Sequence, residues 1–435
     1  MMSNGQRPRI LIAGGGFVGL YTALALERLL PAEAAEVRLV APENFMLYQP
    51  LLPEVASGSV EPRHSVIPLR HALRHTRVTQ GKLTGLDHRR RTATITLSEG
   101  PAREIQYDMV VLALGSVTRL FPVPGLVEHA VGFQTLSEAI HLHNQVLSRI
   151  EAADATDDLT ARRRALTFVF VGAGYAGIEA LAELEDLARN ACRDYPSVSA
   201  EDLHWVLIEA TDRILPSMDQ RLGRRVADQL QARGVDIRLQ TQLEAVDRGT
   251  IELSDGSELI ADTLVWMPGV QANPVAGQLD LPCDDQGRLQ ADRYLRVETI
   301  DGAWTAGDVA RIPDGQGGIY PPTAQHAQRE ARHLAQNIVR TLRGEPLRPF
   351  GYHARGEFVT LGSRKGVARV GPFQLRGMAA WLLRRIYYLT QIPSRDRRLR
   401  LLADWLVGLP FRVDIAQLGS AQHPDRPLDE AAQRS

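Results

Sequence analysis

Cysteine is scarce in this sequence, and the shortage excludes thiol-based redox chemistry. The 435 residues include only two cysteines, Cys192 and Cys283, which lie far apart in the chain. No paired-cysteine motif of the kind that disulfide reductases use is therefore present. The lack of a disulfide framework also favours a reducing compartment.

Net charge and long apolar runs are also missing. The formal net charge at pH 7 is −1, so no overall field attracts nucleic acid, and neither a nucleic-acid partner nor a metal site is predicted. The sequence has no run of about 18 or more apolar residues, so we expect no simple membrane-spanning helix. The short polar start, Met1 to Pro8, lacks the apolar stretch of a secretory signal. These absences predict a cytoplasmic location and leave contact with a membrane surface open.

What the sequence does contain is one structural plan used twice, with the copies roughly 160 residues apart. Each copy begins with an apolar strand, a glycine-rich loop and a helix rich in Ala, Leu and Glu. Each then has a hairpin-rich stretch and a short apolar run that closes at a glycine, as buried parallel strands do. The strand, hairpins and closing run are residues 9–13, 78–107 and 108–115 in the first copy, and 167–171, 237–261 and 262–269 in the second.

Both glycine-rich loops follow the pattern G-x-G-x-x-G between a strand and a helix. In that context the loop amides and the positive end of the helix dipole face a pyrophosphate, and glycine allows the close approach. The repeated context predicts two dinucleotide sites. Their glycines are Gly14, Gly16 and Gly19 in the first copy, and Gly172, Gly174 and Gly177 in the second.

An acid at the end of the second strand of each unit would bind the adenosine ribose. Glu209 ends the strand 204–208, which favours NADH over NADPH, although Arg213 lies close to it in sequence. In the first copy the acid is displaced by two positions, and Glu43 either reaches the ribose or is a solvated loop carboxylate. Two dinucleotides in one chain imply hydride transfer from nicotinamide to flavin, a step that needs alignment more than protein acids or bases.

With these residues established, the sequence resembles the flavoproteins with two dinucleotide folds, and most closely the type II NADH:quinone oxidoreductases. The similarity runs from about Arg9 to Phe411. It rests on the first glycine loop and on the stretches 45–52, 113–116 with 121–125, and 305–308 with Ala324 and Gln325.

The resemblance implies an α/β fold with two Rossmann-like, doubly wound domains and a C-terminal amphipathic helical region. Residues 1–125 and 286–345 would form the FAD-binding domain, residues 126–285 the NAD(H)-binding domain, and residues 346–435 the C-terminal region. The first glycine loop would hold the FAD pyrophosphate, Asp308 the ribityl or phosphate region, Gly115 the flavin and the Val78 backbone the adenine. The second loop, Glu209 and Gly269 would hold NADH.

The resemblance also places an acceptor site beside the flavin. Family members have an Ala-Gln-x-x-x-Gln motif where quinone binds, and here Ala324 and Gln325 match while Arg329 replaces the second glutamine. An arginine could still polarise a quinone oxygen and stabilise the anion that forms. His326 is either a proton donor or a structural histidine. Glu179 either lies near the nicotinamide or is a helix N-terminal carboxylate that the macrodipole stabilises.

The last ninety or so residues combine arginines with Trp, Tyr and Leu. Residues 377–392 and 395–409 are too apolar for exposed helices and too charged for spanning ones. They match helices that lie on a bilayer, with the arginines facing anionic headgroups, or helices that pack on the rest of the protein or form a dimer seam. The resemblance favours peripheral attachment to the cytoplasmic side of the cell membrane.

The sequence therefore predicts an enzyme that binds FAD and NADH and reduces menaquinone or ubiquinone. One alternative is a soluble flavoprotein reductase of a ferredoxin-like protein, which the amphipathic C-terminal region disfavours. A second is a redox sensor that binds FAD and NAD without turnover. A sulfide:quinone reductase would need cysteines near the flavin.

Overall fold

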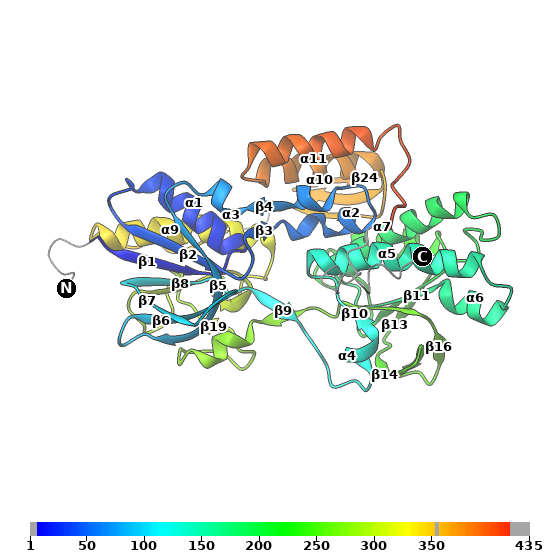
Figure 1. Ribbon diagram of the computed structural model, residues 1–435, viewed down its shortest axis with the longest axis horizontal. Helices are drawn as coiled ribbons and strands as arrows, with labels where there is room; N and C mark the ends of the chain where they lie inside the picture. The colour runs from blue at the N-terminus through cyan, green and yellow to red at the C-terminus, as the bar shows by residue number, and fades with distance from the viewer. Residues whose placement is uncertain (1–6, 353–355, 418–435) are drawn as a thin grey trace, which may run out of the picture.

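The computed structural model describes residues 7–352 and 356–417. Its larger sheet has seven strands in the order β20-β8-β1-β2-β5-β6-β7, of which the first five are parallel (Figure 1). The chain leaves this sheet after β8 and returns to it with β20. The strands are β1 (Arg9–Ala13), β2 (Glu36–Ala41), β5 (Arg77–Asp87), β6 (Thr92–Leu97), β7 (Arg103–Gln106), β8 (Met109–Leu112) and β20 (Ala303–Thr305).

The second sheet repeats the plan with five parallel strands in the order β10-β17-β11-β12-β13. Its strands are β10 (Ala130–Val131), β11 (Thr167–Val171), β12 (His204–Glu209), β13 (Val235–Leu239) and β17 (Thr263–Trp266). An antiparallel set precedes the closing strand: β14 (Leu243–Asp247), β15 (Thr250–Leu253) and β16 (Glu258–Ile260).

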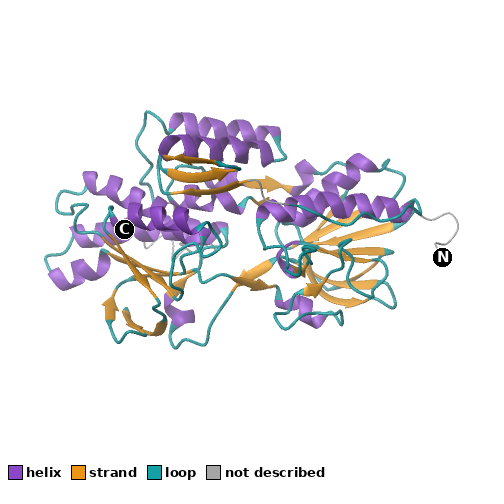
Figure 2. Cartoon of the chain, turned by 180° about the vertical axis from the view of Figure 1, so that it is seen from behind, coloured by secondary structure: helices purple, strands orange, loops and turns teal. Residues whose placement is uncertain are grey.

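Helices flank both sheets, as Figures 1 and 2 show. On the first sheet, α1 (Phe17–Leu29) and α9 (Ala324–Leu342) pack against each other. The second sheet is accompanied by α5 (Leu136–Asp154), α6 (Leu159–Ala165), α7 (Tyr175–Ala191) and α8 (Gln220–Gln231). Alternating parallel strands and helices give the predicted α/β fold with two Rossmann-like units, which is confirmed.

The strand orders locate the expected ligand crevices. In the first sheet the direction of winding reverses between β1 and β8, and in the second between β11 and β17. Ligands of doubly wound sheets bind at this reversal, outside the carboxyl ends of the strands. Each glycine loop leaves the carboxyl end of β1 or β11, so each lies at such a point.

Short elements join the two units. A two-stranded antiparallel ribbon pairs β9 (Ser116–Thr118) with β18 (Val270–Ala272). The helix α2 (Leu52–Ala56) packs on α5 and α7 of the second unit. The remaining short elements are β3 (Phe45–Leu47), β4 (Val66–Pro68), α3 (Leu69–Ala72), α4 (Leu126–His129), β19 (Leu289–Gln290), β21 (Ala310–Arg311) and the single turns η1 (Gln49–Leu51), η2 (Pro62–Ser65), η3 (Cys192–Asp194), η4 (Pro274–Gln278) and η5 (Gly307–Val309).

The C-terminal region is a sheet and two helices that lie across both units (Figure 1). The strands β22 (Gly356–Thr360), β23 (Gly366–Val370) and β24 (Phe373–Arg376) are antiparallel, and the sequence reasoning did not predict them. The predicted helices are α10 (Gly377–Gln391) and α11 (Arg395–Val407). Residues 1–6, 353–355 and 418–435 of the predicted domains lie outside the described residues. Within the described ranges, no helix is long and apolar enough to cross a membrane.

Candidate active site

The first glycine loop makes a tight turn that only glycine permits. Gly14 has a φ of +119°, and a Cβ on it would lie 2.0 Å from the carbonyl oxygen of Ala113. A Cβ on Gly19 would lie 1.9 Å from the carbonyl oxygen of Gly14. The protein itself therefore requires glycine at these two positions, because strand β8 and helix α1 both come close to the loop.

The second loop has the same geometry. Gly172 has a φ of +105°, and a Cβ on it would lie 2.2 Å from the carbonyl oxygen of Met267. A Cβ on Gly177 would lie 2.1 Å from the carbonyl oxygen of Gly172. In both loops the middle glycine differs, since no described atom lies within 4 Å of a Cβ built on Gly16 or Gly174. Glycine at these positions leaves room for a bound group.

The helices that follow the two loops begin without a side-chain cap. Helices α5, α8 and α9 have their first amides capped by Thr135, Asp219 and Thr323. Among the described residues, no side chain caps α1 or α7, and neither has an acid in its first turn. Uncapped amides at a positive helix end fit the pyrophosphates of FAD and NADH.

The ribbon of β9 and β18 brings the two units together at the glycines that end β8 and β17. Gly115 has a φ of +68° and its carbonyl accepts a hydrogen bond of 3.1 Å from the amide of Asn273. Gly269 has a φ of +115° and its carbonyl accepts one of 3.1 Å from the amide of Arg119. The carboxyl ends of both sheets therefore face one shared region, where dinucleotides on the two loops can meet.

Asp308 lies in η5 beside this ribbon. Its Oδ2 accepts a hydrogen bond of 2.7 Å from the Ser116 hydroxyl. Burial raises the pKa of Asp308, and the Ser116 bond opposes that shift. The sequence reasoning missed Glu330 of α9, whose Oε2 accepts a 2.8 Å bond from the Gly307 amide and whose pKa burial raises to about 7. Its place among buried Ala327, Ala331 and Leu334 was an available signal, because an acid there needs a buried partner.

The predicted ribose acids are placed differently. Glu209 ends β12, where its Oε2 accepts a hydrogen bond of 2.8 Å from the Ala173 amide and its Oε1 one of 2.9 Å from the Thr211 amide. It therefore fixes the second glycine loop from the side where a ribose would lie. Glu43 stands in an exposed turn after β2. Val78 is buried in β5 opposite Leu39 of β2.

The acceptor motif forms the first turns of α9. The side-chain oxygen of Gln325 accepts a bond of 3.3 Å from the Tyr352 hydroxyl, and Arg329 donates to the Gln325 carbonyl at 3.0 Å. The Arg329 guanidinium lies 4.3 Å from the centre of the Tyr352 ring. Ala324 begins the helix and is partly buried. The structure thus brings Ala324, Gln325 and Arg329 together.

His326 has a structural role. Its Nδ1 lies 2.7 Å from the Thr323 hydroxyl. Burial and, to a smaller extent, the positive charge of Arg329 lower its pKa to about 4. A ring that is neutral throughout the physiological range suits the structural interpretation better than the proton donor. Its neighbour Gln328 is buried, and its side-chain oxygen has no hydrogen-bond partner among the described residues, so a polar acceptor remains open there.

Glu179 is part of a buried ion-pair cluster that neither sequence interpretation anticipated. Arg384 of α10 donates to Glu179 Oε2 at 2.9 Å and to Glu54 Oε1 of α2 at 2.9 Å. Glu179 Oε1 also accepts 2.9 Å from the Thr360 amide, and Glu54 Oε2 accepts 2.8 Å from the Trp405 indole. The cluster therefore joins both dinucleotide units to the C-terminal region.

The cysteines stay apart from these groups. Cys192 lies in η3, at the end of α7 opposite the glycine loop. Cys283 lies 3.7 Å from the Ala276 carbonyl, beyond the ribbon in sequence. Their placement gives no support to a thiol-dependent flavoenzyme. Across the described ranges, no group of three or more His, Cys, Asp or Glu side chains is arranged to hold a metal ion.

Known proteins share this arrangement. Residues 8–331 match the family model of the pyridine nucleotide-disulphide oxidoreductases. The chain is 30% identical to the type II NADH:quinone oxidoreductase Ndh of Mycobacterium tuberculosis, over 92% of this chain and 88% of that protein. It is 31% identical to the demethylphylloquinone reductase NdbB of Synechocystis, over 92% and 96%.

The fold has a solved counterpart. The structure of NDH2 from Plasmodium falciparum in complex with NADH superposes with a TM-score of 0.88, at 17% identity, over 94% of this chain and 100% of that chain. Together with the paired glycine loops and the shared ribbon, these matches confirm the predicted family. The chain belongs to the pyridine nucleotide-disulphide oxidoreductases and, within them, to the type II NADH:quinone oxidoreductase family of FAD-dependent enzymes.

Proposed function

We propose that this protein transfers a hydride from NADH to FAD and then passes two electrons to a membrane quinone. The single observation that supports this most strongly is the β9–β18 ribbon. It links the segment after β8 to the segment after β17, with Gly115 bonded to Asn273 at one end and Gly269 bonded to Arg119 at the other, so that two dinucleotides on the two loops can converge on one region. Convergence supplies the alignment that hydride transfer requires.

In this proposal the chain's own residues bind the two dinucleotides and orient them. The amides of α1 and α7 hold the two pyrophosphates, Glu209 fixes the second loop and the ribose, and Asp308 anchors the flavin side through its bond to Ser116. FAD, when bound, supplies the two-electron chemistry that side chains lack. Gly115, Val78, Glu43 and Gly269 contribute backbone or ribose contacts in the same proposal.

The acceptor would bind at the start of α9. Arg329 holds a positive charge beside Gln325 and Tyr352, and a positive group there stabilises an oxyanion on a quinone. The open side-chain oxygen of Gln328 adds a hydrogen-bond acceptor for a quinol hydroxyl. A ferredoxin-like acceptor is disfavoured because the C-terminal surface is apolar.

Two anaerobic half-reactions test the function. NADH should bleach the bound flavin, and a short-chain quinone analogue should restore its absorbance. Bleaching without recovery would support reduction of the flavin by NADH and would contradict its reoxidation by quinone.

The C-terminal helices support a peripheral membrane location, for a different reason than the sequence suggested. We expected the arginines of these helices to face headgroups. Arg384 (0% exposed) and Arg385 (8%) instead point inward to Glu54, while Arg395 and Arg400 of α11 are exposed. The exposed positions of the two helices are mainly apolar. On α10 and α11 the exposed apolar residues are Met378, Leu382, Ile386, Leu399, Leu402, Leu406 and Val407.

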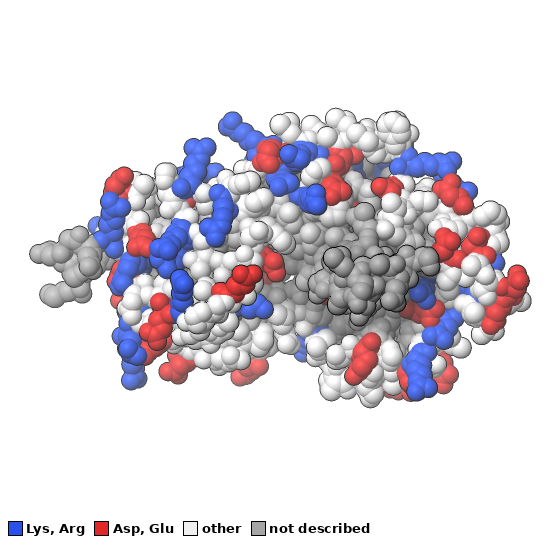
Figure 3. Space-filling view, in the orientation of Figure 1, with Lys and Arg blue, Asp and Glu red and all other residues white. Residues whose placement is uncertain are grey.

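These residues form the outer face of the C-terminal region. Apart from Val407, which follows Leu406 directly, their spacing of three or four residues places them on one side of each helix. Figure 3 shows uncharged atoms along the edge where Figure 1 places α11, with basic side chains beside them. We infer that this face lies on the cytoplasmic side of the membrane, where NADH is available and lipid-soluble quinone can reach α9.

Changing Met378, Leu382 and Ile386 together to serine should release the protein from lipid vesicles. Each side chain contributes about 1 kcal/mol of partitioning, so the three should weaken binding about a hundredfold. Vesicle sedimentation measures it, and NADH oxidation with a water-soluble quinone should persist. Serine at the equally exposed Val127, Leu159 and Ile260 is the matched control. Unchanged sedimentation with loss of a dimer would identify the face as a dimer seam instead.

A further inference from the structure

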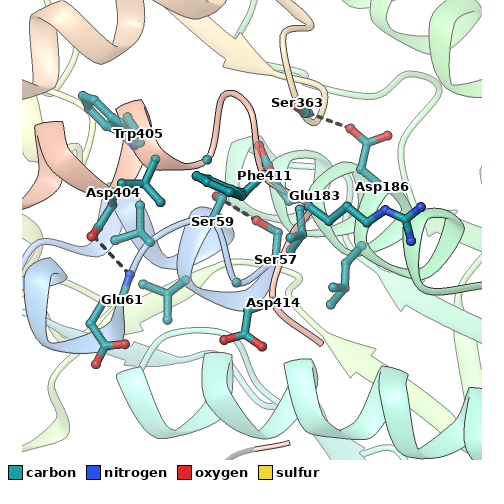
Figure 4. A pocket seen from close by; sticks show the side chains of 18 of the residues that line it. Ser57, Ser59, Glu61, Glu183, Asp186, Ser363, Asp404, Trp405, Phe411 and Asp414 are labelled. Atoms are coloured by element: carbon teal, nitrogen blue, oxygen red, sulfur yellow. Dashed lines mark hydrogen bonds between the residues drawn. The ribbon is translucent and has the colours of Figure 1, made fainter. Parts of the chain in front are cut away.

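A partly open cavity of about 410 Å3 lies beside the C-terminal half of α7. Its walls come from the loop after α2 and from α5, α7, α10, α11 and the segment after α11 (Figure 4). Small-molecule sites usually have volumes of about 300–1,000 Å3, so a ligand fits this space. Its described lining contains no residue of the glycine loops or of the acceptor motif.

One face of α7 forms an inner wall of the cavity. The residues of this face are Glu183, Asp186, Leu187 and Asn190, at positions i, i+3, i+4 and i+7 of the helix. Asp186 already binds Lys365, whose Nζ lies 2.9 Å from its Oδ1. Glu183 is only 4% exposed, and no residue within the described ranges donates a hydrogen bond to its carboxyl group. A buried carboxyl group at a cavity wall needs a partner, which a ligand or water supplies.

Two further hydrogen-bond acceptors belong to residues that line the same cavity. His143 of α5 is 7% exposed, and its Nδ1 lies 2.9 Å from the Ala56 carbonyl oxygen. Because a carbonyl oxygen only accepts, Nδ1 carries the proton there, and Nε2 of the neutral ring is left as an acceptor. Asn190 donates from its Nδ2 to the Asp186 carbonyl at 2.7 Å, which leaves its Oδ1 as an acceptor. The cavity therefore suits a ligand that carries N–H donors.

The charged groups around the cavity leave a surplus of negative charge. Six acids and six cations form ion pairs with one another and balance, with His64 beside Asp404 counted as neutral. They are Glu54, Glu179, Glu185, Asp186, Asp194 and Asp404, and Arg189, Arg233, Lys365, Arg384, Arg385 and Arg412. The other charged groups of the described wall are three acids, Glu61, Glu183 and Asp414, and one cation, Arg364. A cation in the cavity therefore brings the region closer to neutrality.

Much of the remaining wall is apolar and includes Trp381, Trp405 and Phe411. The Arg385 guanidinium lies 3.7 Å and 4.6 Å from the two indole ring centres and pairs with Glu54, so this cation is already enclosed. Across the described ranges no group of three or more His, Cys, Asp or Glu side chains could hold a metal ion. Acceptors on one wall and aromatic rings on others fit an organic cation rather than a metal.

We propose that this cavity is a binding site for a small organic ammonium ion, whose positive nitrogen donates to the carboxylate of Glu183. His143 and Asn190 are available to further N–H or O–H groups of the ligand, and its apolar part lies against Trp405 and Phe411. The walls come from the loop after α2 in the first unit, from α5 and α7 in the second and from the C-terminal region, so the bound ion holds these three parts together. This inference does not depend on the reduction of quinone.

Calorimetric titration of the FAD-loaded protein with benzylammonium, a primary ammonium ion attached to one aromatic ring, tests the site. The probe should bind saturably, with one ion per chain. Benzyl alcohol, which has the same ring without the charge, should bind at least about tenfold more weakly, because hydrogen bonds to charged groups are stronger than those between neutral groups. Benzoate, with the opposite charge, should not bind, and neither NADH nor a short-chain quinone should displace benzylammonium.

Glu183→Gln keeps the size of the side chain and removes its negative charge. Its affinity for benzylammonium should fall about tenfold to a hundredfold, while its unfolding temperature without the probe and its reduction by NADH should be unchanged. Glu61→Gln makes the same change at an exposed position of the same cavity and is the matched control. It should alter the affinity less than about twofold, because exposed charges contribute little. Bound benzylammonium should raise the unfolding temperature of the wild type and Glu61→Gln more than that of Glu183→Gln.

Equal affinities of Glu183→Gln and the wild type for benzylammonium would overturn the proposal. Lack of saturable binding by the wild type would also overturn it and would leave the cavity to water. Displacement of the ion by NADH or by the quinone analogue would place it in the redox region and contradict this site. A crystal structure of the complex checks the location, because the ammonium nitrogen should lie within about 3 Å of a Glu183 carboxyl oxygen.

Discussion

Replacing Arg384 with methionine is expected to destabilise the protein by about 3–5 kcal/mol, the cost of leaving a buried ion-pair network without one partner. Arg384 neutralises Glu54 and Glu179, and all three side chains are at most 9% exposed. Methionine has a similar volume, so the loss reflects Glu179 without a cation and Glu54 with only its 3.8 Å contact to Arg385, rather than a cavity. Thermal unfolding should begin several degrees lower, with α10 and β22 separating from α7.

Arg385→Met is the matched control for this prediction. Arg385 lies in the same helix and reaches Glu54 at 3.8 Å, but its guanidinium also stacks 3.7 Å from the Trp381 ring centre. Its removal should still cost less than that of Arg384, because it contacts only one of the two acids, at 3.8 Å rather than 2.9 Å. Combining Arg384→Met with Glu179→Gln should recover much of the stability, because Glu54 keeps its contact with Arg385 and Glu179 no longer carries an unpaired charge. An Arg384→Met protein that unfolds at the wild-type temperature would contradict the stabilising role of this ion-pair cluster.

Alanine at Gly14 should abolish FAD binding, whereas alanine at Gly172 should impair reduction of the flavin by NADH. In each case the new Cβ would stand within 2.2 Å of a carbonyl oxygen at a positive φ, so the loop must move. Gly14→Ala should be purified without flavin. Gly172→Ala should keep its flavin and be reduced by NADH more than about a hundredfold more slowly, since misplacement of about 1 Å has that effect. Flavin absorbance and stopped-flow reduction measure the two outcomes.

The middle glycines supply the control. No described atom lies within 4 Å of a Cβ on Gly174, so Gly174→Ala should unfold at the wild-type temperature. Its added methyl group should still weaken NADH binding at least about tenfold, because it stands where the pyrophosphate approaches. A Gly172→Ala protein that loses flavin and is otherwise normal would contradict the assignment of the two loops.

The parts of the fold that the sequence predicted have local signals. The strands 9–13 and 167–171 were predicted correctly because an apolar run and a glycine loop lie next to each other in each case. The β9–β18 ribbon has only three residues in each strand, and its pairing joins segments that lie far apart in sequence. No local pattern predicts such a contact.

The candidate site likewise combines residues that have a local sequence signal with residues that have none. The glycines were recognisable because their conformations are intrinsic to the loop. Arg384 was misinterpreted because an arginine in an apolar helix suits either a headgroup or a buried acid, and the deciding partners Glu54 and Glu179 lie 330 and 205 residues away in sequence.

The most direct test of the account is a single anaerobic titration of the flavin-loaded protein. One equivalent of NADH should bleach the flavin absorbance, and one equivalent of a short-chain menaquinone or ubiquinone analogue should restore it with formation of quinol. Flavin that NADH cannot bleach would contradict convergence of the two dinucleotides at the β9–β18 ribbon and would favour a sensor that binds both without turnover.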